Sequence, residues 1–423
     1  MLDAKFIRAN LDRVRAGVEA KGEKVNLEEY VALDKQRLSL LVEVDSLKAE
    51  RNKASEEIAA EVREGRDAQA KKEAMRGVSK RIKELDETLK DLEEKLEKLI
   101  LWIPNLAHES VPVGRGEEDN KIVRAWGKKP EFDFQPLAHW DIAEALDIID
   151  FRRGAMISES NFVVFKGKGA RLARAIINFM LDLHTTKHGY TEIAPPALVN
   201  RASMTGTGQL PKLEVDMYHC DADDLFLIPT AEVPVTNLRR GEIMEGADLP
   251  IYYTAYTPCF RREAGSYGKD TRGLNRVHQF DKVELVKFVA ADRSYDELEL
   301  LVADAEEVLQ AFGLYYRVNL LCTGELSFSA AKCYDLEAWS PGQQKWLEVS
   351  SCSNFEDFQA RRMGIRYRPA QGEKVRFVHT LNGSGVALPR TMIAILETYQ
   401  TKDGKVRVPD VLVPYMDGVK VIE

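Results

Sequence analysis

One basic segment is the most informative part of the sequence: Cys259-Phe260-Arg261-Arg262-Glu263-Ala264-Gly265, continued by Arg272-Gly273 and Arg276-Val277-His278-Gln279-Phe280. The flanking residues 252–260 and 283–289 predict strands, so the segment predicts a β-hairpin with a basic loop. The cationic residues of this hairpin are Arg261, Arg262, Lys269, Arg272 and Arg276. A guanidinium donates paired hydrogen bonds to phosphate oxygens, which suits a polyphosphate ligand. Taken alone, a solvated basic hairpin explains the segment equally well.

The rest of the chain makes this local positive charge unusual. The 423 residues include 60 Lys and Arg against 68 Asp and Glu, for a net charge of −8. An acidic chain is not a general polyanion binder, so any nucleic-acid or phosphate contact requires clustered basic residues. The length predicts two domains rather than one. The 30% of charged residues suggests a long solvated helical element.

Cysteine usage and hydropathy bear on compartment and metal content. The five cysteines are scattered and form no Cys-x-x-Cys pair, which supports neither a disulfide framework nor a zinc ribbon. We therefore expect reduced thiols and no zinc. The charged segment Met1–Lys5 is typical of neither a signal peptide nor a transit peptide. No apolar run reaches membrane-spanning length, so we expect a cytoplasmic protein with no membrane partner.

Residues from about 27 to 101 predict two long helices. In the second, apolar residues alternate at spacings of three and four, like the seam of a coiled coil: Ile82, Leu85, Leu89, Leu92, Leu96 and Leu99. The first helix carries a looser stripe: Leu33, Leu40, Val44, Leu47, Ala54 and Ile58. Between them, Gly65 is a C-cap candidate and Asp67 an N-cap candidate. Because the break is short, we expect an antiparallel hairpin rather than a dimerisation coiled coil.

The remainder of the chain predicts an α+β fold. Ile103-Pro104-Asn105 ends the second helix, and glycines and prolines up to about residue 136 indicate a linker. Amphipathic helices are expected over 171–188 and 296–312. There is no regular βαβ repeat and no Walker or dinucleotide glycine loop, which argues against a parallel-sheet nucleotide fold.

Three segments of the chain resemble the signature motifs of class II aminoacyl-tRNA synthetases. Phe260–Glu263 followed by His278–Phe280 resembles the second motif. The sequence of residues His278–Glu284 resembles the seryl-tRNA synthetases in particular. Gly189–Pro196 resembles the first motif, and Asn382–Arg390 the third. The third motif departs mildly from its usual glycine-rich form, because Leu388-Pro389 precedes the arginine. Proline suits the first turn of a helix, so the arginine should keep its place. The motifs occur in order over nearly the whole chain.

The resemblance implies a fold, a reaction and partners. The fold would be an N-terminal antiparallel helical hairpin followed by a catalytic domain on a mostly antiparallel sheet. Residues 1–105 would bind tRNA, residues 106–423 would catalyse, and the region 189–196 would form a homodimer interface. The activity would be that of a serine–tRNA ligase with ATP as substrate and Mg²⁺ as cofactor. The tRNA partners would be tRNA(Ser) and, where the organism has one, the selenocysteine tRNA, tRNA(Sec).

The resemblance also assigns site residues. The implied catalytic residues are Arg261, Glu263 and Arg390. The implied serine-binding residues are Thr230, Ala231, Glu232, Arg261, Glu284, Asn382 and Ser384. The implied ATP-binding residues are Arg261, Arg262, Glu263, Arg276, Val277, Phe280, Glu348, Val349, Ser350, Ser351 and Arg390. Glu348 and Ser351 would hold Mg²⁺, since both offer hard oxygen ligands.

Roles follow residue by residue from the same resemblance. Arg261 would hold the ATP α-phosphate and the serine carboxylate, and Glu263 would sit near adenine or orient the arginines. Phe280 would stack on adenine while the backbone of Val277 reads the base edge. Arg276 and Arg390 would approach the distal phosphates and the other face of adenine.

Basic residues near the turn of the hairpin are the implied tRNA contacts: Arg63, Arg66, Lys71, Lys72 and Arg76. Four acidic residues lie among them and nearly cancel their charge, so a solvated tip remains the alternative: Glu61, Glu64, Asp67 and Glu73.

Two rival functions remain open. Another class II synthetase, such as the threonyl or prolyl enzyme, is disfavoured by the helical arm. A synthetase-like protein that binds RNA or protein without catalysis is disfavoured by five intact residues of the motifs: Arg261, Glu263, Glu284, Glu348 and Arg390.

Overall fold

The computed structural model describes residues 1–264 and 271–423, which form two compact units. The larger unit, here the core unit, comprises Met1, Ala20–Gly22 and Asn105–Glu423. The smaller, here the arm unit, comprises Leu2–Glu19 and Glu23–Pro104. Two residues of the expected hairpin loop, Gly265 and Lys269, lie outside the described residues.

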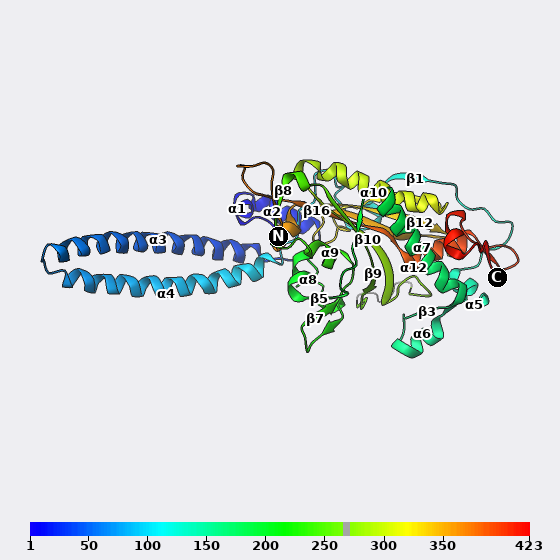
Figure 1. The fold of residues 1–423 in the computed structure, drawn as a ribbon, viewed down its shortest axis with the longest axis horizontal. Helices are drawn as coiled ribbons and strands as arrows, with labels where there is room; N and C mark the ends of the chain where they lie inside the picture. The colour runs from blue at the N-terminus through cyan, green and yellow to red at the C-terminus, as the bar shows by residue number, and fades with distance from the viewer. Residues whose placement is uncertain (265–270) are drawn as a thin grey trace. The chain divides into compact units, whose positions relative to one another are not determined.

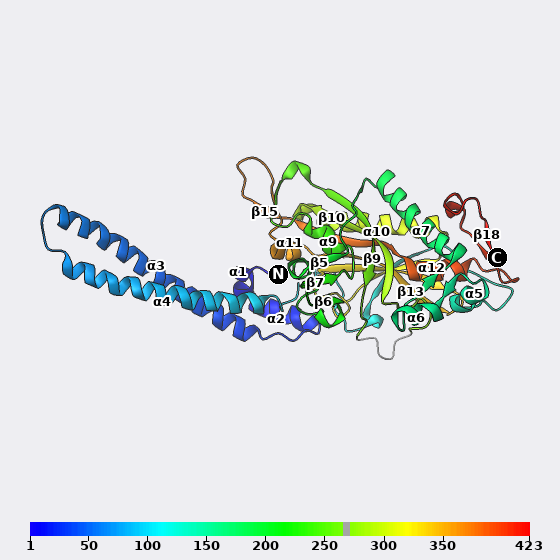
Figure 2. The same ribbon diagram turned by 60° about the horizontal axis from the view of Figure 1, so that its bottom comes forward.

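The arm unit is built around two long antiparallel helices (Figures 1 and 2). Its helices are α1 (Ala4–Ala9), α2 (Leu11–Ala20), α3 (Leu27–Arg63) and α4 (Gln69–Ile100). The side chain of Asn26 caps α3 by accepting a hydrogen bond from the backbone N–H of Glu29. Gly65 follows the C-cap of α3 with φ of +73°, a conformation that favours glycine. The predicted hairpin is confirmed.

The seam between α3 and α4 follows the expected pattern. All five buried residues of α4 belong to the predicted stripe: Ile82, Leu85, Leu89, Leu92 and Leu96. Val44 of α3 packs against two of them, with Leu40 and Leu47 beside it. Asp34 is also buried, which the apolar pattern did not indicate. It accepts hydrogen bonds from Arg8 and Arg37, so its charge is compensated.

The core unit contains an eight-stranded sheet in the order β1-β11-β12-β13-β16-β10-β9-β4. Its strands are β1 (Lys121–Trp126), β4 (Thr191–Glu192), β9 (Ile251–Phe260), β10 (Gln279–Val289), β11 (Tyr316–Leu320), β12 (Lys332–Ser340), β13 (Lys345–Asn354) and β16 (His379–Ala387). Every pairing is antiparallel except that of β4 with β9. The mostly antiparallel sheet is therefore confirmed.

The expected strands and helices of this unit are present, and one expected linker contains a strand. The two strands around the basic segment pair as β9 and β10, with Phe260 opposite Gln279. Residues 105–136 were expected to be a linker, but β1 lies within them and pairs with β11 at the sheet edge. Most residues of β1 are exposed, so the strand lacks the apolar alternation that would have indicated it.

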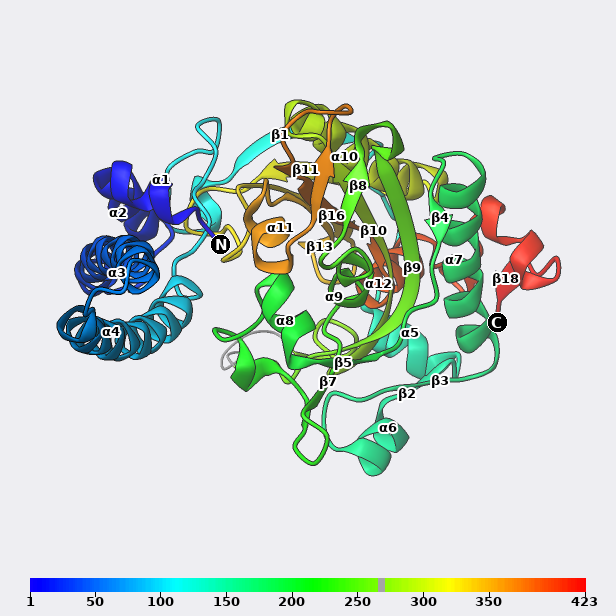
Figure 3. The same ribbon diagram turned by 60° about the vertical axis from the view of Figure 1, so that its left-hand side comes forward.

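Helices cover both faces of the sheet (Figure 3). On one face lie α7 (Gly167–Thr186), α10 (Ser294–Ala311) and α12 (Leu388–Thr398), packed in the main hydrophobic core with Val283 and Leu285 of β10. On the other lie α8 (Arg201–Thr207), α9 (Glu232–Asn237) and α11 (Phe358–Met363). Val286 and Phe288 of β10 pack on that side with residues of α9 and α11. Because side chains alternate along a strand, Lys282 and Glu284 also face α9 and α11.

The other elements of the core unit are short. Its other α-helices are α5 (His139–Ala145) and α6 (Phe151–Ser158). Its other strands are β2 (Ile149–Asp150), β3 (Val164–Phe165), β5 (Leu198–Asn200), β6 (His219–Cys220), β7 (Leu225–Leu227), β8 (Ile243–Glu245), β14 (Arg366–Arg368), β15 (Arg376–Phe377), β17 (Val406–Arg407) and β18 (Val421–Ile422). Among the helices of the described chain, none combines the length and apolar character needed to cross a membrane.

Candidate active site

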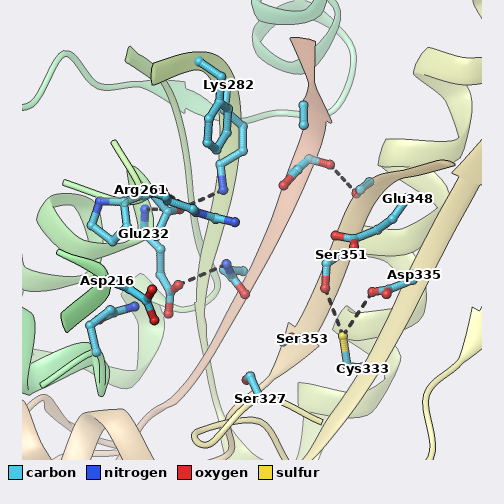
Figure 4. A pocket seen from close by; sticks show the side chains of 18 of the residues that line it. Asp216, Glu232, Arg261, Lys282, Ser327, Cys333, Asp335, Glu348, Ser351 and Ser353 are labelled. Carbon is cyan, nitrogen blue, oxygen red and sulfur yellow. Dashed lines mark hydrogen bonds between the residues drawn. The ribbon is translucent and has the colours of Figure 1, made fainter. Parts of the chain in front are cut away.

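A cavity of about 660 Å³ lies in the core unit, lined by residues of β10, β12, β13 and β16 (Figure 4). Most residues expected to form the serine and ATP sites contribute to its lining. They are Thr230, Glu232, Arg261, Glu263, Arg276, Val277, Phe280, Glu348, Val349, Ser350, Ser351, Asn382, Ser384 and Arg390. Residues far apart in the sequence are thus brought to one cavity by the pairing of the central strands.

Three expected site residues are not part of this lining as the described residues define it. Ala231, the N-cap residue of α9, is fully buried in apolar packing. Arg262 is exposed, and its guanidinium lies 6.0 Å from the ring centroid of Tyr218. Glu284 is 1% exposed and lies behind Asn382, whose Nδ2 donates to Glu284 Oε1 at 2.7 Å. The five expected tRNA contacts belong to the arm unit.

A β-bulge aligns β10 with β16 at the site. Val283 pairs with Val386 and Glu284 pairs with Ser384, so Gly385 is the extra residue between them. A Cβ atom at position 385 would lie 2.8 Å from His184 Nε2, which explains why glycine occupies this position. The bulge places Glu284 directly beside Ser384.

Two carboxylates and a lysine form the buried end of the cavity. Asn382 Nδ2 lies between the carboxylates, 2.7 Å from Glu284 Oε1 and 3.3 Å from Glu232 Oε2. Lys282 Nζ lies 2.7 Å from Glu284 Oε2 and donates to Thr230 Oγ1 at 2.9 Å. Burial and the neighbouring Glu284 raise the pKa of Glu232 to about 7. One cation for two carboxylates leaves this end suited to a positively charged ligand.

Arginines from three segments line the rest of the cavity. Arg261 Nε donates to the backbone oxygen of Pro229 at 3.2 Å, and its guanidinium lies 5.2 Å from the ring centroid of Phe280. Arg276 forms an ion pair with Glu263. Arg390, on the first turn of α12, donates to the backbone oxygen of Glu348 at 2.9 Å. These cations surround a space that suits phosphate groups.

Oxygen ligands gather on β12 and β13, near Arg390. Asp335 pairs across the two strands with Ser351, and both line the cavity with Glu348 (Figure 4). Burial and the charge of Glu348 raise the pKa of Asp335 well above its ordinary value. Two carboxylates and a hydroxyl with this excess of negative charge fit Mg²⁺, which prefers hard oxygen ligands. Within residues 1–264 and 271–423, no group of three or more His, Cys, Asp or Glu side chains could hold a metal ion.

Three polar residues at the site were not assigned by sequence reasoning. Lys282 lies within the segment that carries the family resemblance. Because it is two residues before Glu284, the sequence could have predicted that both side chains lie on the same face of the strand. Asp335 and Gln359 lie outside the quoted motifs. Gln359 donates to Glu232 Oε1 at 2.6 Å from a helix 127 residues away in the sequence, a contact that no local pattern predicts.

Comparisons with known proteins identify the family of this chain. The family model for the seryl-tRNA synthetase N-terminal domain matches residues 1–107, and the model for the tRNA synthetase class II core domain (G, H, P, S and T) matches residues 215–399. A serine–tRNA ligase of Geobacter sulfurreducens is 57% identical over 422 residues, covering 100% of both chains. The chain belongs to the seryl-tRNA synthetase family. A serine–tRNA ligase of Listeria monocytogenes is 55% identical over 424 residues, covering 100% of this chain and 99% of the relative.

Solved structures of the family have the same fold. The seryl-tRNA synthetase of Pyrococcus horikoshii complexed with ATP aligns with a TM-score of 0.94 and 39% identity, covering 100% of this chain and 99% of the other. The cytoplasmic serine–tRNA ligase of Naegleria fowleri in complex with AMP aligns with a TM-score of 0.87 and 30% identity, covering 99% and 97%. Each of these two relatives has an adenine nucleotide bound.

Proposed function

We propose that this chain is a serine–tRNA ligase that activates serine with ATP and transfers the seryl group to tRNA(Ser). The observation that carries this proposal is that one cavity combines an acidic end, formed by Glu232 with Glu284 buried behind it, with Arg261. Serine carries an ammonium group and a carboxylate, and ATP carries phosphates, so the cavity offers charges complementary to both substrates. Membership of the seryl-tRNA synthetase family supports the choice of serine.

The acidic end is the proposed serine site. The carboxylate of Glu232 would receive the substrate ammonium, and Thr230, Asn382 and Ser384 would supply hydrogen bonds to the small polar side chain. Glu284 would act from behind by orienting Asn382, with which it shares a hydrogen bond of 2.7 Å. Ala231 has no cavity-facing side chain, so its contribution would be to position its neighbours.

The arginine-lined region is the proposed ATP site. Phe280 would stack on adenine, with the backbone of Val277 at the base edge, and Arg276 and Arg390 would approach the phosphates. The ion pair between Glu263 and Arg276 supports a role for Glu263 in orienting that arginine. Val349 and Ser350 would complete the lining, and Arg262 would reach the nucleotide only by leaving the ring of Tyr218.

The proposed reaction has two steps. An oxygen of the serine carboxylate attacks the ATP α-phosphorus, forming a new P–O bond while the bond to pyrophosphate breaks. Arg261 would contact both reacting groups and neutralise the charge that develops at phosphorus. A terminal hydroxyl of the tRNA then attacks the carbonyl carbon of seryl-adenylate, and AMP leaves. Much of the rate enhancement would come from positioning and charge neutralisation.

Glu348 and Ser351 would hold Mg²⁺, with Asp335 close by. When bound, the ion would neutralise phosphate charge. Arg390 already contacts Glu348, its Nη1 lying 3.3 Å from Oε2, so the two side chains would be placed together at the phosphates.

Further proposals concern partners and assembly. Residues 1–105 would form the tRNA-binding domain and residues 106–423 the catalytic domain. The exposed edge strand β4 lies in the segment 189–196 and supports a homodimer through that edge. Charging of tRNA(Sec) and a cytoplasmic location would follow from the family.

The decisive experiment is amino-acid-dependent exchange of pyrophosphate into ATP, tested with all twenty amino acids. Serine alone should support exchange. A response to threonine or proline in place of serine would favour another class II synthetase, and no response to any amino acid would favour a non-catalytic relative.

A further inference from the structure

A fully buried glutamine lies behind the carboxylate at the acidic end of the cavity. Gln359, on α11, is 0% exposed. Its Nε2 donates to Glu232 Oε1 at 2.6 Å and to the backbone oxygen of Thr207 at 3.0 Å. Its Oε1 accepts from the hydroxyl of Thr380 at 2.7 Å. Both ends of the amide are therefore satisfied inside the protein.

These partners determine which way the amide points. An ionised carboxylate and a backbone carbonyl only accept hydrogen bonds, so the NH₂ group must face Glu232 and Thr207. The amide oxygen must then face the hydroxyl of Thr380. Thr207 and Glu232 thus fix the orientation of the amide, and Thr380 holds its oxygen in that orientation.

The two oxygens of Glu232 consequently have different surroundings. Oε1 is held from the buried side by Gln359 at 2.6 Å. Among the described residues, Oε2 receives only a long contact of 3.3 Å from Asn382 Nδ2, a group that also serves Glu284. One oxygen is anchored, and the other remains available to a ligand in the cavity.

We propose that Gln359 is a positioning residue for serine recognition, which anchors Oε1 of the Glu232 carboxylate and presents Oε2 to the substrate ammonium. The proposal rests on the function proposed above for the cavity. Gln359 would act through Glu232 and would not touch the substrate itself.

The charges around Glu232 explain why a neutral donor matters here. Burial and Glu284 raise the pKa of Glu232 to about 7, while the hydrogen bond from Gln359 and the charges of Lys282 and Arg261 lower it. Without the donor, the pKa of Glu232 should rise further, so less of the enzyme would be ionised at neutral pH. Capture of serine should then require a higher pH, because the acid limb of kcat/KM reports ionisation in the free enzyme.

The test is serine-dependent pyrophosphate exchange by the full-length Gln359→Leu protein, measured over a range of pH. We expect the KM for serine to rise roughly tenfold or more, as is typical for a lost hydrogen bond to a charged group. The KM for ATP should stay within about twofold, because the nucleotide does not meet Glu232. The acid limb of kcat/KM for serine should move to higher pH, which a merely structural role for Gln359 would not cause.

Two further variants complete the test. Gln400→Leu removes another buried glutamine, one that contacts Leu137 and not the cavity, so it controls for the loss of a buried amide. Its serine KM and acid limb should match those of the parent. Thr380→Val keeps the side-chain shape and removes the hydroxyl that holds the amide oxygen of Gln359, so it should move the acid limb in the same direction by less.

The outcomes separate the two proposals. A folded Gln359→Leu protein with the parent's serine KM and acid limb would overturn the positioning role. If that variant does not fold, Thr380→Val decides, and an unmoved acid limb overturns the role. A parent protein without serine-dependent exchange would instead overturn the proposed function of the cavity.

Discussion

Lys282 Nζ lies 2.7 Å from Glu284 Oε2, and both side chains are buried on the face of β10 that carries the cavity. The two residues are two apart on one strand, so they project from the same side of the sheet. Removing one partner of a buried ion pair leaves the other charge uncompensated. The pair therefore links serine recognition at the cavity to the stability of the sheet.

Glu284→Gln should raise the KM for serine far more than the KM for ATP. The carboxylate orients Asn382 at the acidic end, whereas the arginines that would meet ATP lie elsewhere in the cavity. We expect the KM for serine to rise roughly tenfold or more, since hydrogen bonds to charged groups contribute about 1.5–3 kcal/mol. Pyrophosphate exchange at varied serine and varied ATP measures both.

A control for this variant comes from a second ion pair, between Lys287 of β10 and Glu297 of α10. Lys287 and Glu297 form another buried pair with Nζ and Oε2 3.0 Å apart, and neither lines the cavity as the described residues define it. Glu297→Gln should lower stability while leaving the serine KM unchanged. If Glu284→Gln raised the KM values for serine and for ATP equally, the assigned serine site would be wrong.

Glu232→Gln should stabilise the free protein at alkaline pH while abolishing serine activation. The pKa of Glu232 is about 7 in the folded state against 4.5 ordinarily, so the folded state binds the proton more tightly. Stability therefore falls as pH rises from about 4.5 to about 7, by about 3 kcal/mol in total. Glutamine has no charge to titrate, so the variant should not lose this stability as the pH rises.

Denaturant unfolding at about pH 5 and about pH 8 checks the prediction. The variant should exceed the parent in stability at the higher pH, and the difference should shrink towards the lower pH. Glu297→Gln, which breaks the pair with Lys287, should instead be less stable than the parent at the higher pH. A Glu232→Gln protein that is less stable than the parent at the higher pH would contradict the raised pKa.

Local patterns predicted the longest helices and the two strands around the basic loop, and not the contacts that join them at the site. Period-3.5 spacing indicated the seam of α4, and apolar runs indicated β9 and β10 around the basic loop. The donation from Gln359 to Glu232 spans 127 residues and depends on how α11 packs against the sheet. The exposed edge strand β1 has no buried face, so its sequence resembles a linker.

Arg261→Ala should abolish adenylate formation while the protein stays folded. The loss of a charged contact to a transition state costs about 3 kcal/mol or more, a rate decrease of roughly a hundredfold or greater. Arg239→Ala is the matched control, because Arg239 also lies over an aromatic ring, 5.8 Å from the centroid of Tyr253, against 5.2 Å for Arg261 and Phe280. Serine-dependent exchange and circular dichroism are the measurements. Near-normal exchange by Arg261→Ala would refute its role.

Glu348→Gln should weaken divalent-cation binding in the ATP complex. Glu348 and Ser351 offer the oxygen ligands, and we expect at least the roughly tenfold loss of affinity typical of changes around a bound metal. Electron paramagnetic resonance of Mn²⁺, used in place of Mg²⁺, measures the affinity with ATP present. Glu325→Gln removes another cavity carboxylate and controls for net charge.

Metal analysis of the purified protein tests the same site in a second way. We expect no retained zinc, because the ligands at Glu348 and Ser351 are oxygens. Stoichiometric zinc would contradict this and would direct attention to His219 and Cys220, which are adjacent on β6.

Removing the helical hairpin should separate the two steps of the reaction. α3 has 37 residues and is therefore about 55 Å long, with charged exposed faces that suit contact with a nucleic-acid backbone. Near its turn, Lys71 pairs with Glu57 and Glu61, while Arg63, Lys72 and Arg76 are exposed. Deleting residues from about 33 to 96 should leave serine-dependent pyrophosphate exchange largely intact, because that reaction needs no tRNA, while charging of tRNA collapses.

Charge variants test the same contact in the full-length chain. Neutralising Arg63, Lys72 and Arg76 together should weaken tRNA binding and lower its salt dependence by about one unit of slope per lost phosphate contact. Neutralising three exposed lysines of α4 further from the turn, Lys83, Lys90 and Lys95, is the matched control and should change the slope less. A deletion protein that charges tRNA with the parent's kcat/KM would show that the hairpin is not the tRNA-binding element. Unchanged binding in the charge variant alone would place the contact away from the turn, on the remaining faces of α3 and α4.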